Sequence, residues 1–323
     1  MIKVGILGTG GMGKTHARQY AKIPEVSLIF YDRDPQRAAE FQQLTGGESA
    51  PDADRVIREC DVLDVCLPTH LHLEYASLGL RAGKPVFCEK PMCRTTAECA
   101  ELVELSEKTG TPLMPAQVVR YFPEFRTAHR LVQDGKVGLP AAIRTRRGGR
   151  FPKGSADWFS DFALSGGVIL DLMIHDLDWI RWTFGQVERV FCQSLTFTGI
   201  KEKDYALATL TLASGALAHV EATWADPGGF RVTFEVCGSD GMIEFDSRLY
   251  PTLRTTTEAG SVSESPLAPT DDPYYREIRE FLDAVASGSP PPVSGLDGLR
   301  AVALAEAAIE SARTGKAVTP GRG

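Results

Sequence analysis

The sequence predicts an α/β chain of two domains, an N-terminal domain with a parallel sheet and a C-terminal α+β domain with an open, mainly antiparallel sheet. A glycine-rich turn follows an apolar run that starts at Ile2. Strand-like and helix-like segments then alternate as far as about residue 118. From about residue 141, short strands joined by tight turns replace that pattern. We therefore expect domains at 1–120 and 121–323, with a C-terminal helix able to pack back on the first.

Composition limits the functions that the chain can have. Its 323 residues are 43% hydrophobic and 24% charged, which is enough for two sizeable cores. The net charge of −7 argues against nucleic acid or an anionic membrane as partner. The sequence shows neither a membrane-length apolar run nor a signal peptide, so we expect a cytoplasmic protein. Seven cysteines without C-x-x-C spacing indicate reduced thiols, and we expect no metal.

The first domain is expected to alternate strands and helices in order. Asp34 is a plausible N-cap with Pro35 at the first helical position, and Thr95-x-x-Glu98 is a capping box. Glycines close the helices at 46–47, 83 and 110. The predicted strands are 26–31, 62–67, 86–88 and 113–116, and the predicted helices are 35–44, 71–82 and 95–109.

The second domain is expected to be mainly antiparallel, because short links such as Ser214-Gly215 join neighbouring strands. One long helix over 168–184, ending at Gly185, interrupts the strands. We expect a mobile loop over 256–272 and helices over 274–286 and 297–313. The predicted strands are 141–147, 187–198, 205–212, 216–224, 231–237 and 242–245.

The motif Gly8-x-Gly10-x-x-Gly13, between a strand and a helix, predicts the dinucleotide-binding turn of a Rossmann domain. Gly8 suits the tight bend, Gly10 lets the backbone approach a pyrophosphate, and Gly13 lets the helix pack close to the strand. The helix N-terminus then presents free N–H groups to the phosphates. The alternative is a glycine-rich structural turn. The residues expected to bind cofactor here are Gly8, Gly10, Gly11, Met12 and Gly13.

The residue at the end of the second strand indicates which dinucleotide binds. Asp32 can accept hydrogen bonds from the ribose hydroxyls of NAD and would repel the 2′-phosphate of NADP. Arg33 beside it could pair with that phosphate, or could be only a solvated charge. We therefore expect NAD, with NADP left open.

A first chemical motif, Glu89-Lys90-Pro91, stands where a parallel strand ends. Ligands of open α/β sheets bind outside that edge. Pro91 stops the strand, so Lys90 can point its ammonium into the crevice beside the nicotinamide. The alternative for Lys90 is a solvated surface charge.

A second motif, Asp171-x-x-x-His175, lies in the apolar helix 168–184. Spacing of four places both side chains on one helical face, with Asp178 next along it. Polar groups in a buried helix need partners, so acid–base chemistry is our first interpretation and a structural Asp–His pair the second. A metal site is third, because no third ligand stands at a recognisable spacing.

With these motifs the chain resembles the Gfo/Idh/MocA family, which includes glucose-fructose oxidoreductase and inositol dehydrogenases. The resemblance runs from the glycine turn through Glu89-Lys90-Pro91 and the Asp171 helix to the segment 297–301. It implies that Lys90, Asp171 and His175 form the catalytic set. It also implies contacts between copies through the open sheet, hence a homodimer or homotetramer.

The resemblance implies further contacts. Thr69 and His72 would lie near the cofactor, Gln117 and Arg120 would face cofactor and substrate, and Trp158 would wall the pocket. His72 as a helix-face residue and Trp158 as core filler are the alternatives. The full expected cofactor set outside the glycine turn is Asp32, Arg33, Leu67, Pro68, Thr69, His72, Glu89, Lys90 and Gln117, and the expected substrate set is Lys90, Arg120, Trp158, Asp171 and His175.

The function implied is reversible hydride transfer between NAD and a secondary alcohol. His175 would take the hydroxyl proton, Lys90 would stabilise the oxygen, and Asp171 would orient substrate or imidazole. A polyol or cyclic sugar suits a polar pocket, with inositol as first guess, although segment 227–230 lacks the tyrosine associated with inositol enzymes. An NAD-dependent glycoside hydrolase and a non-catalytic NAD-binding sensor stay open as alternatives.

Overall fold

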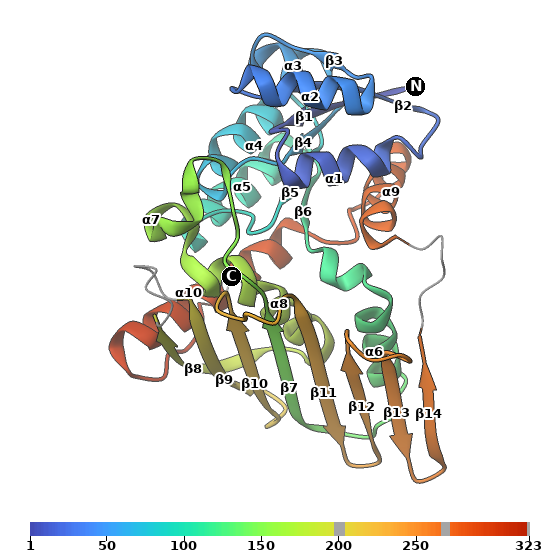
Figure 1. Cartoon of the computed structure of the whole chain (residues 1–323), viewed down its shortest axis with the longest axis vertical. Coiled ribbons are helices and arrows are strands. Elements are labelled where there is room, and N and C mark those ends of the chain that lie inside the picture. The colour runs from blue at the N-terminus through green and yellow to red at the C-terminus, as the bar shows by residue number, and fades with distance from the viewer. Residues whose placement is uncertain (197–203, 266–271, 322–323) are drawn as a thin grey trace. The chain divides into compact units, whose positions relative to one another are not determined.

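The computed structural model of the chain describes residues 1–196, 204–265 and 272–321, and it divides into two compact units (Figure 1). The first unit contains Met1–Val118 and Asp272–Leu299, and the second contains Val119–Asp271 and Arg300–Gly323. The sequence alone placed the division at residue 120. None of the described helices is both long enough and apolar enough to cross a bilayer.

The first unit is built on a six-stranded sheet in the order β3-β2-β1-β4-β5-β6, with every pair of neighbours parallel. The order reverses between β1 and β4, which is the switch point of a doubly wound sheet. The predicted Rossmann domain is therefore confirmed. Its strands are β1 (Ile2–Leu7), β2 (Val26–Tyr31), β3 (Glu48–Ser49), β4 (Val62–Val65), β5 (Val86–Glu89) and β6 (Leu113–Ala116).

Local signals in the sequence set the helix ends of this unit. The Asp34 carboxylate accepts hydrogen bonds from the first turn of α2, and Thr95 with Glu98 forms the predicted capping box of α5. Helix α3 was not predicted, although Asp52 caps it. The helices are α1 (Gly11–Tyr20), α2 (Pro35–Thr45), α3 (Ala53–Glu59), α4 (His72–Arg81) and α5 (Thr96–Thr109).

A helix from late in the chain completes the first unit. Helix α9 (Pro273–Ser287) lies beside α1 (Figure 1), and the ring of Phe281 stacks on Phe87 of β5 with centroids 5.3 Å apart. The Gln19 amide of α1 also donates a hydrogen bond to Asp272, the cap of α9, at 2.9 Å. The last helix, α10 (Gly295–Thr314), begins in this unit and continues into the second.

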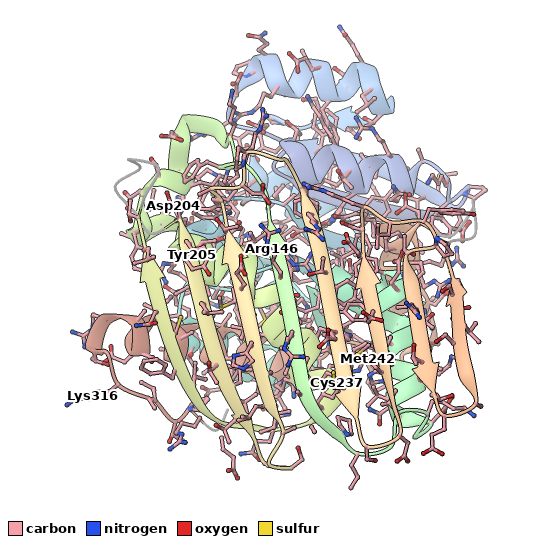
Figure 2. All side chains as sticks on the ribbon, turned by 60° about the horizontal axis from the view of Figure 1, so that its bottom comes forward. Arg146, Asp204, Tyr205, Cys237, Met242 and Lys316 are labelled. Atoms are coloured by element: carbon pink, nitrogen blue, oxygen red, sulfur yellow. The ribbon has the colours of Figure 1, made fainter. Side chains whose placement is uncertain are left out.

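The second unit contains an eight-stranded sheet in the order β14-β13-β12-β11-β7-β10-β9-β8, laid out face-on in Figure 2. Neighbours are antiparallel except for the β7–β10 pair, so the predicted open, mainly antiparallel sheet is confirmed. Its strands are β7 (Pro140–Gly148), β8 (Val187–Leu195), β9 (Tyr205–Leu212), β10 (Leu217–Thr223), β11 (Arg231–Gly238), β12 (Gly241–Asp246), β13 (Leu253–Thr257) and β14 (Gly260–Glu264).

The prediction of a loop over 256–272 was wrong for its first part. Strands β13 and β14 pair as a hairpin, whose turn uses Gly260 at φ +127°. Strand β14 is exposed along its whole length and has no apolar alternation, because it forms the edge of the sheet and buries neither face. Residues 266–271 of that prediction, and 197–198 of the strand predicted over 187–198, lie outside the described residues.

The long helix predicted over 168–184 has an irregular start. A π-helical turn, Ile169–Met173, precedes the regular helix α8 (Ile174–Phe184). Gly166 and Gly167, both at positive φ, lead the chain into this turn. Turns of this type are rare and frequently occur at functional sites. Periodicity at 3.6 residues per turn could not predict the wider turn.

Aromatic rings fill the core between the second sheet and its helices. Helix α6 (Pro123–Gln133) brings Phe125 within 5.1 Å of the Trp179 ring of α8, measured between centroids. The same Phe125 ring lies 5.0 Å from Phe234 of β11 and 5.7 Å from Phe245 of β12. One residue therefore holds two helices on one face of the sheet (Figure 1).

We predict that Phe125→Ala lowers the free energy of unfolding of the second unit by about 3–5 kcal/mol, because it leaves a cavity among three rings. The matched control is Phe230→Ala, since Phe230 is 64% exposed, and it is expected to cost under about 0.5 kcal/mol. Urea unfolding followed by tryptophan fluorescence measures both. Equal losses in the two variants would contradict the prediction.

Candidate functional site

The predicted cofactor residues of the first unit gather at one edge of its sheet. They lie at or after the carboxyl ends of β1, β2, β4, β5 and β6, which all point the same way because the sheet is parallel. The structure brings together, at this edge, Gly8, Gly10, Gly11, Met12, Gly13, Asp32, Arg33, Leu67, Pro68, Thr69, His72, Glu89, Lys90 and Gln117.

The three motif glycines have different reasons to lack a side chain. Gly8 has φ +91°, and a Cβ there would lie 2.6 Å from the carbonyl oxygen of Cys66. A Cβ on Gly13 would lie 2.1 Å from the carbonyl oxygen of Gly8, so the helix packs against the turn. A Cβ on Gly10 would meet nothing within 4 Å. Gly10 therefore faces open space, and it begins α1 without a side-chain cap on the helix N–H groups.

Asp32 is held in place by its neighbours. Its Oδ2 accepts hydrogen bonds from the backbone N–H and the hydroxyl of Thr9, both at 2.9 Å. Its Oδ1 pairs with Arg37 at 2.7 Å. Partial burial opposes ionisation, but these hydrogen bonds outweigh it and hold the pKa of Asp32 below its ordinary value. Asp32 is thus a fixed carboxylate at the end of β2.

The guanidinium paired with Asp32 belongs to Arg37 and not to the neighbouring Arg33, which is exposed. Sequence reasoning considered only Arg33, because it adjoins Asp32. Arg37 stands in the first turn of α2, where a side chain can turn back toward the strand end. The sequence does show that Arg37 falls in the first turn of a helix that begins at Asp34-Pro35, and this placement could have indicated the pair with Asp32.

His72 connects two loops of the sheet edge. Its Nδ1 lies 2.8 Å from the carbonyl oxygen of Pro91, and its Nε2 lies 2.7 Å from that of Leu67. The ring is buried, and burial lowers the pKa of His72. The imidazole therefore links the loop after β4 to the Lys90-Pro91 segment. A contact between His72 and cofactor stays a prediction.

Two further groups at this edge bear on binding. The Lys90 backbone N–H donates to the Glu89 carboxylate at 3.1 Å, which fixes the backbone on which the Lys90 side chain stands. The Gln117 side chain is 1% exposed, and neither its oxygen nor its nitrogen has a hydrogen-bond partner among the described residues. A buried amide without partners is costly. A ligand with polar groups would satisfy it.

Together these residues fit a nicotinamide dinucleotide. The open side of Gly10 and the uncapped start of α1 suit a pyrophosphate, and the Asp32 carboxylate suits ribose hydroxyls. The Gln117 amide and Lys90 stand at the ends of β6 and β5. The first unit therefore has the donors and acceptors that such a cofactor requires.

The second unit contains the other predicted catalytic residues. Asp171 lies in the π-helical turn with 9% exposure, and His175 lies in the first turn of α8. Lys90 belongs to the first unit, whereas Asp171 and His175 belong to the second. Their union in one catalytic set stays a prediction.

Buried ion pairs hold helix α8 in the second unit. Asp176 pairs with Arg147 of β7 at 2.7 Å, and both side chains are buried. Asp178 accepts two hydrogen bonds from Arg120, at 2.7 and 2.6 Å. Sequence reasoning did not find the Arg147 pair, although two aspartates in an apolar helix signal that buried cations must face them.

Two residues predicted to contact substrate have structural contacts. The Arg120 guanidinium binds Asp178 and lies 5.4 Å from the ring centroid of Trp182. Trp158 lies in a 3₁₀ turn, Ser155–Ser160, and stacks on Phe159 with centroids 3.9 Å apart. Substrate contacts of both residues stay predictions.

Comparison with known proteins agrees with this geometry. Residues 2–117 match the family described as "Oxidoreductase family, NAD-binding Rossmann fold". Residues 125–244 match "GFO/IDH/MocA C-terminal domain". The two matches fall within the first and second units respectively.

Similar proteins cover nearly the whole chain. A myo-inositol 2-dehydrogenase of Thermotoga maritima is 30% identical, over 96% of this chain and 96% of that protein. An inositol 2-dehydrogenase of Klebsiella pneumoniae is 27% identical, over 98% and 96%. A solved levoglucosan dehydrogenase in complex with NADH shares the fold, with a TM-score of 0.91, 24% identity and 99% of both chains covered.

The glycine turn yields a prediction that separates packing from binding. Gly13→Ala is expected to lower stability by about 1–3 kcal/mol, because the new Cβ meets backbone. Gly10→Ala is expected to keep stability within about 0.5 kcal/mol but to weaken NADH binding at least about tenfold, because it narrows the open side of the turn. Thermal unfolding and NADH fluorescence titration measure the two effects. Unchanged NADH affinity in Gly10→Ala would show that the pyrophosphate binds elsewhere.

Proposed function

The chain belongs to the Gfo/Idh/MocA family of NAD-binding oxidoreductases, as its motifs indicated, and from this premise we propose that it is a dehydrogenase of polyols or cyclic sugars. It would transfer a hydride between NAD and a secondary alcohol. The observation that supports this most is the sheet edge of the first unit, where a glycine turn open at Gly10 and a fixed Asp32 carboxylate stand at the same edge as Lys90.

The preference for NAD over NADP rests on charge. The ionised Asp32 would accept hydrogen bonds from ribose hydroxyls and repel a 2′-phosphate. Arg37 already neutralises part of that carboxylate, so the preference is a balance between two side chains. Released from Asp32, Arg37 would be the group to attract a 2′-phosphate.

Three residues have roles in the proposed chemistry. When bound, the nicotinamide supplies the hydride acceptor. His175 would accept the proton of the substrate hydroxyl as general base. Lys90 would hydrogen-bond the same oxygen and stabilise its developing negative charge. Asp171 would orient the substrate or the imidazole, which suits a carboxylate held in a buried turn.

The substrate class is a polyol or cyclic sugar, with inositol first. Relatives named as inositol 2-dehydrogenases at 27–30% identity support this choice. Phe230 stands in the segment 227–230, where inositol enzymes are associated with a tyrosine, and it is 64% exposed. The absence of this tyrosine bears on which polyol is oxidised, and it does not change the proposed substrate class of polyols and cyclic sugars.

We also propose that the chain forms a homodimer or homotetramer through the open face of the second sheet. A groove of about 720 Å³ lies on that face, where Arg146 (Figure 2) pairs with Glu221 at 3.2 Å. Leu249 and Tyr250 at the groove are 63% and 89% exposed. Exposed apolar residues beside paired charges suit contact with a second copy.

A substrate screen tests the function. We expect NADH absorbance to rise with NAD and at least one free polyol or sugar, and Lys90→Met and His175→Ala to lower kcat about a hundredfold or more. Lys136→Met, at an exposed site of the second unit, is the matched control and should keep full activity. Cleavage of aryl glycosides without net NADH would favour a hydrolase instead, and no turnover in either assay would favour a sensor.

Cofactor choice gives a second prediction. NADH should bind more tightly than NADPH. Asp32→Ala should reduce the ratio of the two dissociation constants, because the carboxylate that repels the 2′-phosphate is gone. In that background, Arg37→Ala should weaken NADPH binding more than Arg33→Ala does, since Arg37 and not Arg33 faces position 32. Isothermal titration of both cofactors measures this. Equal dissociation constants in the unmutated protein would overturn it.

A further inference from the structure

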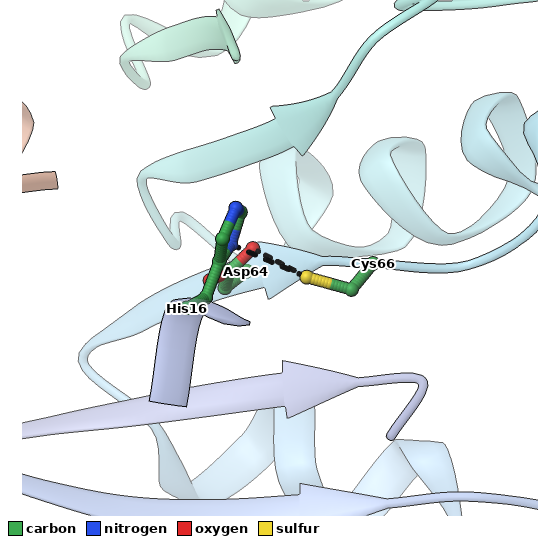
Figure 3. Close-up of side chains that lie close together, drawn as sticks. All are labelled: His16, Asp64 and Cys66. Atoms are coloured by element: carbon green, nitrogen blue, oxygen red, sulfur yellow. Dashed lines mark hydrogen bonds and ion pairs between the residues drawn. The ribbon is translucent and has the colours of Figure 1, made fainter. Parts of the chain in front are cut away.

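Three buried polar side chains meet inside the first unit, near the carboxyl edge of its sheet (Figure 3). His16 comes from α1, Asp64 from β4, and Cys66 from the chain just after β4. His16 Nδ1 lies 2.9 Å from Asp64 Oδ2, and Cys66 Sγ lies 3.2 Å from Asp64 Oδ1. His16 and Asp64 are fully buried. None of these residues belongs to the predicted site.

The second nitrogen of His16 faces another carboxylate. Its Nε2 lies 3.0 Å from Glu89 Oε1, an ion-pair contact without hydrogen-bond geometry, and Glu89 is only 5% exposed. A neutral imidazole carries one N–H, so it would turn a lone pair toward one of its two carboxylates. An imidazolium carries a positive charge that both carboxylates attract, through a hydrogen bond to Asp64 and an ion-pair contact with Glu89.

Among the groups around the two carboxylates, His16 is the one that can carry a compensating positive charge. Tyr20 of α1 donates to Asp64 at 3.0 Å, and Tyr274 of α9 lies 6.4 Å from the His16 ring, near the fully buried Glu277. Burial raises the pKa of Tyr20, Cys66 and Tyr274, so these groups stay neutral. Burial lowers the pKa of His16, and the negative charge of Asp64 and its hydrogen bond to the ring oppose that effect.

We propose that His16 is a buried imidazolium that bridges the Asp64 and Glu89 carboxylates and thereby positions Lys90. The link to Lys90 is direct, because the other oxygen of Glu89 accepts the Lys90 backbone N–H at 3.1 Å. His16 thus connects the dinucleotide-binding helix to the strand end that presents Lys90. The charge stands on geometry alone, whereas the role in catalysis rests on the proposed function.

The same side chains are of types that bind metals, but the contacts favour a proton. A metal needs the Cys66 thiolate, whereas burial raises the pKa of this thiol. Asp64 Oδ2 is already occupied by Tyr20 and His16. The His16–Asp64 distance of 2.9 Å is that of a charge-assisted hydrogen bond.

Nitrogen NMR of the full chain with ¹⁵N-labelled histidine tests the charge without any substrate. We expect one histidine to show two protonated ring nitrogens at pH 8.5, and His16→Gln to remove that signal. His219→Asn, on the exposed face of β10, is the matched control and should leave it. A spectrum at pH 8.5 without a doubly protonated ring, or loss of the signal on adding one equivalent of Zn²⁺, would overturn the proposal.

Charge variants test the bridge. Asp64→Asn and Glu89→Gln should each make His16 release its proton at least tenfold more readily, seen as a shift of its titration by at least about one pH unit. Tyr20→Phe removes a hydrogen bond to Asp64 but no charge, so it should shift the titration less. Equal shifts in all three variants would overturn the proposal. The variants at Asp64, Glu89 and Tyr20 keep His16 itself, so this experiment can be done even if His16→Gln folds poorly.

Positioning is tested at Lys90 itself. In ¹⁵N-lysine-labelled protein, His16→Gln should move the Lys90 amide signal and speed its hydrogen exchange about tenfold, with Lys136 unchanged. If the proposed function also holds, His16→Gln and Glu89→Gln should lower kcat and should change the KM for polyol by a smaller factor. An unchanged Lys90 amide would overturn the positioning role. If the Lys90 amide changes as expected but the unmutated protein shows no dehydrogenase activity, the proposed function is refuted and this inference still stands.

Discussion

A buried carboxylate is tolerated only where a positive group or several donors compensate it, and this requirement shapes both units. In the second unit, Asp176 and Asp178 stay buried in α8 because Arg147 and Arg120 face them. In the first unit, Asp64 and Glu89 flank His16. Each pairing joins segments distant in the chain. Charge compensation thus fixes where α8 sits on its sheet, and the proposed imidazolium of His16 would do the same for α1.

The parallel sheet adds a geometric constraint to this electrostatic one. Every strand of the first unit ends at the same edge, so short loops from five strands meet there without long insertions. The His72 ring and the Asp32 carboxylate then tie neighbouring loops together. A dinucleotide arriving at this edge meets groups that are already fixed, which lowers the entropy lost on binding.

The sequence predicted features whose cause is local. The glycine turn, the Asp34 cap and the Thr95 capping box all depend on residues within a few positions of one another. The parallel and antiparallel sheets followed from strand spacing. The β13–β14 hairpin escaped prediction because an exposed edge strand needs no apolar pattern, and the π-helical turn because no known periodicity encodes it.

Contacts between residues that are distant in the chain could not be predicted from the sequence. The sequence offered Arg33 as a possible partner of a 2′-phosphate, which stays a prediction, but it did not indicate that Arg37 pairs with Asp32. Arg120 binds Asp178 far along the chain, and its expected contact with ligand stays a prediction. The cluster around His16 combines residues from α1, β4 and β5 that no spacing rule connects. Residue types were visible in the sequence, whereas their pairing required the three-dimensional structure.

Helix α9 completes the first unit but lies near the C-terminal end of the chain, and this order affects how the protein folds during synthesis. The first unit lacks its Phe281–Phe87 contact until the chain has passed through the whole second sheet. During synthesis, the nucleotide-binding sheet therefore emerges early with Phe87 of β5 not yet covered by Phe281, because α9 leaves the ribosome near the end. Native contacts this far apart in sequence slow folding. Apolar surface that is exposed before α9 is made can associate with other chains, so this interval is the stage at which aggregation competes with folding.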